Sequence, residues 1–261
     1  MKELTSRDNA TYKALAKLAT SSSERRRTGQ SVLDGAHLLQ AFLDGGFMPE
    51  AVYASREGRQ RSEVAALLER CAAQPQFLLG DALFAALSTV ESPTGILAVI
   101  RTPPPRPVPA TAGFVLLLEA IQDPGNVGTL LRSAAAAGVE HVLLSAQCAF
   151  AWSPKVVRAG MGAHFALNIV EGADLGAFVG TFAGSAIALE GGAGRSLYEL
   201  DLRGPVAFLV GNEGAGLSPA VLEAADVRAH IPLSPRVESL NAGVAGAVAL
   251  FEAARQRRMR A

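Results

Sequence analysis

Short, largely apolar runs alternate with helix-like segments through the second half of this 261-residue chain. The runs lie at residues 114–118, 141–145, 166–170, 186–189, 206–210 and 227–231. Helices are expected at residues 126–138, 154–160 and 173–182, after Ser218, and at residues 239–257. Continuous apolar strands are typical of parallel sheets buried on both faces. The pattern therefore predicts an α/β fold in which helices cover both faces of a parallel sheet.

Residues with specific backbone preferences mark the ends of these helices. Gly138 is expected to stop the first helix, and Ser218 followed by Pro219 is a typical helix start. Asn126 is expected to cap the first helix, so that Arg132 lies nearly two turns inside it. Ser239 is expected to cap the last helix.

A proline-rich segment at residues 101–112 separates this half from the residues before it. Proline lacks a backbone donor and favours extended geometry, so no core helix or strand is expected to pass through the segment. Before it, helices are expected at residues 10–19, 35–45 and 60–72, and strands at residues 51–54, 76–79 and 96–100. We therefore predict a small α/β domain at 1–100, a semi-rigid linker at 101–112 and a second domain at 113–261.

The composition, 49% hydrophobic and 18% charged, is that of a globular protein with a large core. No apolar run reaches the roughly 20 residues that span a bilayer. The N-terminal segment lacks an apolar signal core, so a cytoplasmic protein with no membrane partner is expected. Cys71 and Cys148 are too isolated for a disulfide framework or a zinc site, and the histidines have no metal-binding spacing. No metal is therefore expected.

The basic residues are mostly arginines, and their distribution matters more than the net charge of zero. Arg25, Arg26 and Arg27 form one consecutive cluster. Because a guanidinium group donates two parallel hydrogen bonds, such a cluster suits phosphate recognition. A solvated surface without a partner is the alternative interpretation.

Three turns rich in glycine and asparagine follow strand-like runs and lead into helix-like ones. They lie at residues 123–132 (DPGNVGTLLR), 209–218 (LVGNEGAGLS) and 231–243 (IPLSPRVESLNAG). Open α/β sheets place their ligand sites at such strand-to-helix junctions. Glycine also lets a backbone approach a ligand closely. The turns, which carry Arg, Glu, Ser and Asn side chains, are therefore expected to form one site from distant segments.

In this order and spacing, the three turns resemble the signature motifs of the SpoU/TrmH family of RNA ribose 2′-O-methyltransferases. That family belongs to the SPOUT superfamily and uses S-adenosylmethionine. The resemblance covers roughly residues 114–257. It implies a trefoil-knotted parallel sheet, which periodicity alone does not predict because knots are rare exceptions to the rules of chain connection. It also implies a homodimer formed through the C-terminal domain.

The resemblance assigns roles to individual residues. The implied cofactor-binding residues are Leu189, Gly191, Gly211, Asn212, Ile231, Leu233 and Leu240. The implied catalytic residues are Arg132, Glu213, Ser239, Asn241 and Asn126. In the family the matching Arg is proposed to deprotonate the ribose hydroxyl. Because the guanidinium pKa lies above about 12, we favour a role for Arg132 in orienting the hydroxyl and neutralising a phosphate. Glu213 is expected to orient Arg132 or the acceptor.

The first domain resembles the substrate-binding domain that is often fused to this family and looks like an RNA-binding ribosomal protein. The residues that carry this resemblance are Asn9, Lys13, Arg25 to Arg27, residues 32–39 and residues 92–98. Asp34 stands where the family usually has Glu. Residues 155–163 resemble the middle stretch of the family, in which Arg158 is an expected phosphate contact. The implied RNA-binding residues are Arg25, Arg26, Arg27 and Arg158.

The sequence departs from the family pattern at three positions. Pro235 stands where Gly is usual, and Gly243 and Gly160 stand where Ser is usual. Pro235 is expected to stiffen the loop over the cofactor, which would change cofactor affinity or RNA preference. None of the departures removes an implied catalytic residue.

The sequence therefore predicts methyl transfer from S-adenosylmethionine to a ribose 2′-hydroxyl of RNA, with rRNA favoured because of the added N-terminal domain. One alternative is a tRNA methyltransferase. Another is a non-catalytic RNA-binding protein that kept the fold, although Arg132 and Asn241 are both present. A dehydrogenase would need a Gly-x-Gly-x-x-Gly turn, and residues 124–128 have one glycine fewer and a different spacing.

Overall fold

The computed structural model describes residues 1–90 and 92–258. The chain folds into two compact units, and one segment of unit 1 lies between two segments of unit 2 in the sequence. Unit 1 contains residues 1–104 together with residues 152–165, and unit 2 contains residues 105–151 and the residues from 166 onward. The predicted C-terminal domain included the inserted segment, which the structure instead groups with unit 1.

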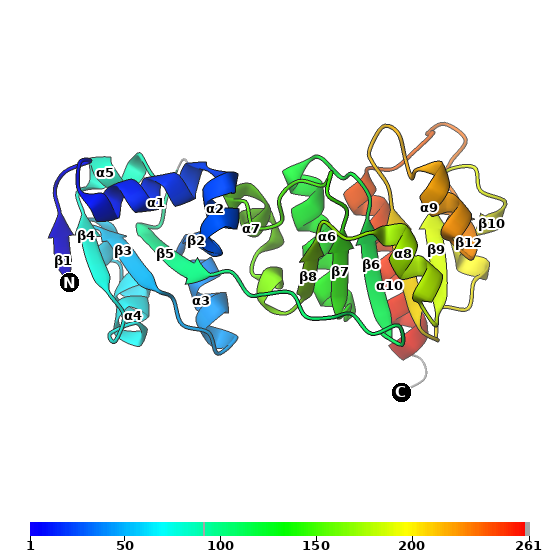
Figure 1. Cartoon of the computed structure of the whole chain (residues 1–261), viewed down its shortest axis with the longest axis horizontal. Helices are drawn as coiled ribbons and strands as arrows, with labels where there is room; N and C mark the ends of the chain where they lie inside the picture. The colour runs from blue at the N-terminus through cyan, green and yellow to red at the C-terminus, as the bar shows by residue number, and fades with distance from the viewer. Residues whose placement is uncertain (91, 259–261) are drawn as a thin grey trace. The chain divides into compact units, whose positions relative to one another are not determined.

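Unit 1 is built on a mixed five-stranded sheet in the order β1-β4-β3-β5-β2. The strands are β1 (Lys2–Leu4), β2 (Gln30–Asp34), β3 (Ala51–Ser55), β4 (Gln76–Leu79) and β5 (Ile96–Arg101). The helices are α1 (Ala10–Thr20), α2 (Ser22–Thr28), α3 (Ala36–Asp44), α4 (Ser62–Arg70) and α5 (Asp81–Ala85) (Figure 1). Strand β5 runs antiparallel to both of its neighbours, β2 and β3. The prediction missed β1, β2, α2 and α5, which are short or flanked by polar residues.

The inserted segment packs against unit 1 through aromatic side chains. It contains α7 (Pro154–Gly160) and a short 3-10 turn, η2 (Ala163–Phe165), and α7 contacts β2. Phe165 lies edge-on to Phe42 of α3, with ring centroids 5.0 Å apart. Gly162 approaches Ala41 so closely that a Cβ there would lie 2.7 Å from the Ala41 Cβ. These contacts explain why a segment that follows a strand of unit 2 belongs to the core of unit 1.

Unit 2 is built on an all-parallel seven-stranded sheet in the order β10-β12-β9-β11-β6-β7-β8. The strands are β6 (Phe114–Leu118), β7 (His141–Leu144), β8 (Asn168–Glu171), β9 (Ser185–Leu189), β10 (Arg195–Ser196), β11 (Val206–Val210) and β12 (Val227–His230). Every residue of the central strands β6 and β11 is buried. The parallel sheet that the sequence predicted is confirmed, and its central strands are apolar throughout.

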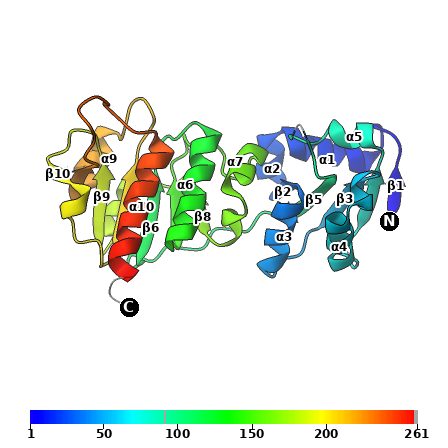
Figure 2. The same ribbon diagram turned by 180° about the vertical axis from the view of Figure 1, so that it is seen from behind.

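Helices cover both faces of this sheet. The unit-2 helices are α6 (Pro124–Ala137), α8 (Leu175–Thr181), α9 (Pro219–Ala224), α10 (Ala242–Arg258) and the 3-10 turn η3 (Leu197–Glu199). Helices α6 and α10 pack side by side on one face, as Figure 2 shows, and α8 packs against α9 on the other. Alternate residues of three strands, including Val115, Ala186 and Ala207, contribute to the core beneath α8 and α9.

Two predicted helix starts are wrong. Helix α6 begins at Pro124, and its cap is Asp123, whose Oδ1 accepts a hydrogen bond from the Asn126 backbone at 2.8 Å. Asn126 therefore lies in the first turn, where its side chain can point away from the helix. Helix α10 begins at Ala242, so Ser239 lies in the preceding loop. Asn241 occupies the capping position, since its Oδ1 accepts a hydrogen bond from the Val244 backbone at 3.2 Å.

Two other predicted helix boundaries, the end of α6 and the start of α9, are confirmed. Gly138 ends α6 in the left-handed conformation, with φ 88°. Ser218 caps α9, and Pro219 occupies its first turn.

A substitution at Gly184, directly before β9, tests how tightly the unit-2 sheet is packed. A Cβ on Gly184 would overlap the Pro205 carbonyl group, whose oxygen accepts the Ser185 N–H at 3.0 Å. We expect Gly184→Ala to lower the free energy of unfolding by about 2 kcal/mol or more, because backbone on both sides must shift. Gly180→Ala is the matched control, since its Cβ meets open space in α8 and alanine favours a helix. Chemical denaturation of both variants measures the difference, and equal effects would contradict the packing argument.

Candidate functional site

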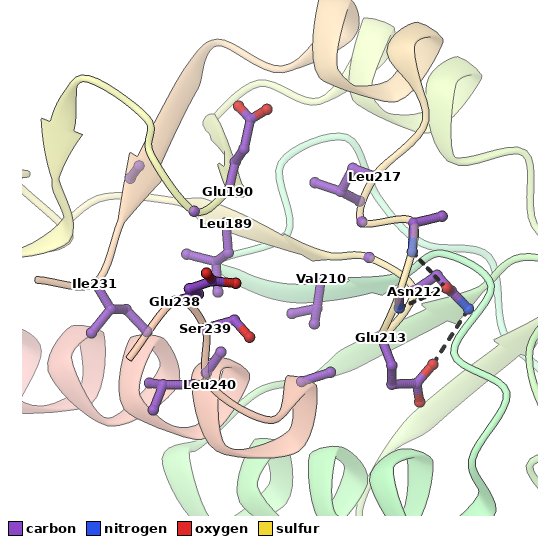
Figure 3. Close-up of a pocket in the computed structure, with 18 of the residues that line it drawn as sticks. Leu189, Glu190, Val210, Asn212, Glu213, Leu217, Ile231, Glu238, Ser239 and Leu240 are labelled. Atoms are coloured by element: carbon purple, nitrogen blue, oxygen red, sulfur yellow. Dashed lines mark hydrogen bonds between the residues drawn. The ribbon is translucent and has the colours of Figure 1, made fainter. Parts of the chain in front are cut away.

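A pocket of about 410 Å³ lies at the carboxyl ends of β9, β11 and β12 in unit 2 (Figure 3). We call it the main pocket. It is lined by Leu189, Glu190, Gly191, Val210, Gly211, Asn212, Glu213, Gly214, Ala215, Gly216, Leu217, Leu222, Ala229, Ile231, Leu233, Glu238, Ser239, Leu240, Ala242 and Ala245. This is the edge at which open parallel sheets place their ligands. The second and third glycine-rich turns both contribute to it.

The lining of the main pocket combines apolar side chains with carboxylates. Leu189, Ile231 and Leu240 face one another across it (Figure 3). Glu190, Glu213 and Glu238 also line it, whereas its lining residues include no lysine or arginine. The pocket therefore suits a ligand with a flat apolar part and a positive charge, and it disfavours one with several phosphates.

The second turn is folded into a tight loop that requires glycine. Asn212 and Gly216 exchange two backbone hydrogen bonds, at 3.0 and 2.9 Å. A Cβ on Gly211 would lie 2.5 Å from the Gly216 carbonyl oxygen, so a larger residue would open the loop. The Asn212 Oδ1 accepts hydrogen bonds from the backbones of Gly214 and Ala215, each at 2.9 Å. The side chain of Asn212 thus holds the loop in one conformation.

The Asn126 side chain joins the three turns. Its Nδ2 donates to the Glu213 carboxylate at 2.9 Å, and its Oδ1 accepts from the Asn241 Nδ2 at 2.9 Å. Glu213 also accepts longer hydrogen bonds from the backbones of Gln122 and Asp123. The structure therefore brings these three side chains together from distant segments, as the sequence predicted.

Gly243 adjoins this network. A Cβ at that position would lie 3.1 Å from the Asn241 Oδ1 and 3.2 Å from the Thr129 side chain. Glycine at this departure from the family pattern therefore leaves room for the Asn126–Asn241 hydrogen bond.

Opposing effects act on the Glu213 carboxyl group. Partial burial raises its pKa, but hydrogen bonds from the Asn126 side chain and from nearby backbone N–H groups lower it by more. The net result is a pKa below the ordinary value. Glu213 is therefore an anion at neutral pH, a state suited to accepting hydrogen bonds and attracting positive charge.

The structure brings most of the residues singled out from the sequence to the main pocket. All seven of the expected cofactor-binding residues line it, as do Glu213 and Ser239. Asn126 and Asn241 adjoin it through their hydrogen bonds. Arg132 does not join this group: it is exposed on α6, and within the described part of the chain it has no hydrogen bond or ion pair. Within this chain, the side-chain partner of Glu213 on α6 is Asn126 rather than Arg132.

The predicted RNA-binding arginines of unit 1 differ in their surroundings. Arg25 is only 5% exposed, and its guanidinium donates to the carbonyl oxygens of Leu18 and Ala19 at 2.5 and 3.3 Å. Burial also lowers its pKa. The prediction of a phosphate contact is therefore wrong for Arg25, which instead holds the end of α1. Arg26 and Arg27 are exposed on α2, and Arg27 pairs with Glu24.

Arg158 of α7 is partly exposed, and its Nη1 donates to the Thr89 carbonyl oxygen at 2.9 Å. It therefore links the inserted segment to a loop of unit 1. Its remaining donors are compatible with a ligand contact.

Sequence reasoning missed several acidic residues of the site. Glu190 and Glu238 line the main pocket, and Glu119 accepts hydrogen bonds from the backbone and hydroxyl of Ser218, both at 2.7 Å. Glu119 and Glu190 each follow directly after a strand, at β6 and β9. Their position at the carboxyl end of a buried strand is the signal that could have identified them.

Among residues 1–90 and 92–258, no group of His, Cys, Asp or Glu side chains could hold a metal ion. Within the same residues, no helix has the length and apolar character needed to cross a membrane.

Comparison with known proteins decides the family. Residues 113–251 match the model of the SpoU rRNA methylase family, and residues 9–98 match that of an MRM3-like substrate binding domain. The chain belongs to the SpoU rRNA methylase family. The family that the three turns indicated is therefore confirmed.

Two curated relatives of this SpoU-family chain match at least 90% of its length. The 23S rRNA (guanosine(2553)-2′-O)-methyltransferase RlmP of Bacillus subtilis is 33% identical over 254 residues, which are 96% of this chain and 98% of that protein. The mouse mitochondrial rRNA methyltransferase 3 is 30% identical and matches 90% of this chain and 70% of its own length.

Solved structures agree with these relatives. The SpoU methyltransferase AviRb from Streptomyces viridochromogenes, in complex with AdoMet, matches with a TM-score of 0.86 and 27% identity over 96% of this chain and 98% of that one. A structure described as an RNA 2′-O ribose methyltransferase matches with a TM-score of 0.83 and 31% identity over 98% and 99% of the two chains.

The effect of Glu213→Gln on the free energy of unfolding should depend on pH, because the substitution removes the negative charge of the network. A carboxyl group whose pKa is lowered on folding adds stability above its unfolded pKa, near 4.5, and loses that contribution as pH falls through the folded value. Wild type should therefore be more stable than Glu213→Gln at pH 7, and the difference should shrink below about pH 4.5. Denaturation at a series of pH values measures it. The exposed Glu223→Gln on α9 is the control, and a difference that grows on acidification would contradict the assigned sign.

Proposed function

We propose that this chain methylates a ribose 2′-hydroxyl of ribosomal RNA, using the main pocket to bind S-adenosylmethionine. The activity predicted from the sequence is S-adenosylmethionine-dependent 2′-O-methylation of RNA. It agrees with the family and with the named activities of relatives that match nearly the whole chain. The observation that carries the proposal is the joining of the three motif turns by Asn126 beside a pocket with acidic and apolar walls.

The main pocket fits S-adenosylmethionine in shape and charge. A Cβ on Gly191 would meet nothing within 4 Å, so this turn offers open space and accessible backbone groups beside the leucines that would contact the adenine. The carboxylates of Glu190, Glu213 and Glu238 suit a ligand with a sulfonium and an ammonium group. A dinucleotide carries phosphates, for which this lining has no basic partner. The charge of the pocket therefore disfavours the dehydrogenase alternative.

When bound, the cofactor supplies an electrophilic methyl group on a positively charged sulfur. The protein has to align the ribose hydroxyl with it, and the hydroxyl proton leaves to bulk water as the O–C bond forms and the S–C bond breaks. A carboxylate with a lowered pKa is a weak base, so we assign Glu213 to orienting Asn126 and stabilising positive charge. Asn126 and Asn241 hold the mouth of the pocket in one arrangement. Ser239, on the pocket wall, is proposed to contact the substrate or the cofactor.

Arg132 is proposed to act on the RNA rather than on the cofactor. It is exposed, it lacks a partner within the described residues and it does not line the main pocket. A guanidinium group in this state can neutralise a phosphate and orient the hydroxyl of the bound nucleotide. We further propose that the chain forms a homodimer through unit 2, in which Arg132 serves the site of the partner subunit.

Unit 1 is proposed to recognise a folded RNA element. The match to an MRM3-like substrate binding domain supports this, and so do the exposed Arg26 and Arg27 and the partly exposed Arg158. Ribosomal RNA is favoured over tRNA because full-length relatives are named as rRNA enzymes. We also propose that the sheet of unit 2 is knotted and that the protein acts in the cytoplasm, as the family resemblance implies.

Transfer of labelled methyl from S-adenosylmethionine to ribosomal RNA tests the function. The RNA is purified from cells in which the gene has been deleted, and the digest should contain label in one 2′-O-methyl nucleoside. Label in the tRNA fraction alone would favour the tRNA alternative. Cofactor binding without transfer to either RNA would favour a non-catalytic RNA-binding protein.

Arg132→Ala should lower kcat for methyl transfer by about 100-fold or more, because a preorganised charge is removed from the transition state. The dissociation constant for S-adenosylmethionine, measured by calorimetry, should stay within about twofold, because Arg132 does not line the main pocket. Arg203→Ala, which breaks an exposed pair with Asp201, is the matched control and should keep full activity. Retained turnover by Arg132→Ala would contradict the assigned role.

A further inference from the structure

A second pocket of about 620 Å³ lies at the same edge of the unit-2 sheet. It is lined by Glu119, Ala120, Gln122, Gln147, Asn212, Ala215, Gly216, Leu217, Ser218 and Pro219. Four of these residues, Asn212, Ala215, Gly216 and Leu217, also line the main pocket. The loop at residues 212–217 is therefore a wall between the two pockets. Figure 3 shows Asn212 and Leu217 among the residues that line the main pocket.

The walls of the second pocket are held rigidly. Ala120 is hydrogen-bonded to two other loops, those that carry Ser145 and Asn212. Its N–H donates to the Ser145 hydroxyl at 3.0 Å, and its carbonyl oxygen accepts from the Asn212 Nδ2 at 2.8 Å. Ala120 has φ 53°, a left-handed conformation that costs a non-glycine residue about 1 kcal/mol or more. Such strain persists only where the surroundings impose it, and it is common at binding sites. The pocket is therefore formed before a ligand arrives.

The chemistry of the lining suits an uncharged, flat group with polar edges. Leu217 and Pro219 offer apolar surface, and no lysine or arginine lines the pocket. The carboxylate of Glu119 is already occupied by two hydrogen bonds from Ser218. The side-chain amides of Gln122 and Gln147 are different, because both residues are exposed and neither amide has a hydrogen-bond partner among the described residues. Each amide offers donors and an acceptor.

We propose that the second pocket binds the base of the nucleotide to be methylated, with Gln122 and Gln147 reading its edge. This inference rests on the proposed RNA methyltransferase function. A glutamine amide can both donate hydrogen bonds to a base edge and accept them from it, and an apolar wall can pack against the face of a base. A phosphate is disfavoured, because the lining carries a carboxylate and no basic group.

The position of the second pocket fits the geometry that the reaction needs. The Gln122 backbone donates to Glu213, which lines the main pocket, so the two pockets meet at the Asn126–Glu213–Asn241 network. A base held beyond the wall at residues 212–217 would place its own ribose at this junction. The base subsite would thus select the nucleotide whose 2′-hydroxyl reaches the donor.

The test compares base selectivity in Gln122→Ala, Gln147→Ala and wild type. The methylated position is first mapped with wild type on ribosomal RNA from gene-deleted cells. Four full-length transcripts of that RNA, which differ only in the base at the mapped position, then serve as substrates. Wild type should prefer one base. Each variant should lower kcat/KM on that base by about tenfold and reduce the preference over the other bases.

Controls separate this inference from the proposed function. The dissociation constant for S-adenosylmethionine and the thermal midpoint should be unchanged in both variants, since their side chains are exposed and do not line the main pocket. The exposed Gln60→Ala in unit 1 should behave as wild type. Equal base preference in wild type and variants would overturn the base subsite while leaving the methyltransferase intact. Absence of transfer by wild type would overturn the proposed function and this inference together.

Discussion

The side-chain amide of Asn126 is the point on which the site depends. Its two hydrogen bonds, both 2.9 Å long, join residues that are 87 and 115 positions away in the sequence. An amide can do this because it donates and accepts at once, whereas a carboxylate or an ammonium group can only accept or donate. The bond to Glu213 fixes the loop of the second turn, and the bond to Asn241 fixes the start of α10. Because α10 packs on α6, the helix that carries Asn126, the network and the helix packing support each other.

The sequence predicted the parts of the fold whose signals are local. Strands β6 and β11 match the apolar runs residue for residue, since a strand buried on both faces has no polar position. Strand β2 was missed because Gln30, Ser31 and Asp34 leave only two apolar residues in it. The place of the inserted segment, which contains α7 and η2, could not be predicted. It depends on contacts such as that of Phe165 with Phe42, which no local pattern encodes.

The site shows the same division between local and distant information. Motif resemblance selected residues that do line the main pocket, because glycines and strand-end positions are visible in the chain. It misjudged Arg25, since three consecutive arginines look alike in sequence. On helix α2 successive side chains point about 100° apart, so one arginine of the three turns inward to the carbonyl groups at the end of α1. The bond between Asn126 and Glu213 was not anticipated, because Asn126 was expected to cap α6, whereas it lies in the first turn of that helix.

The charges of the two pockets imply how RNA recognition is divided. The main pocket is acidic, the second pocket has one occupied carboxylate, and neither is lined by lysine or arginine. Neither pocket can therefore supply the phosphate contacts that provide most of the affinity for a nucleic acid. The exposed Arg132 on α6 and Arg26 on α2 lie outside both pockets, and we propose that they supply such contacts. Phosphate contacts position an RNA and base contacts specify it. On the proposed assignments the two tasks fall to different surfaces, so that affinity and selectivity could change independently.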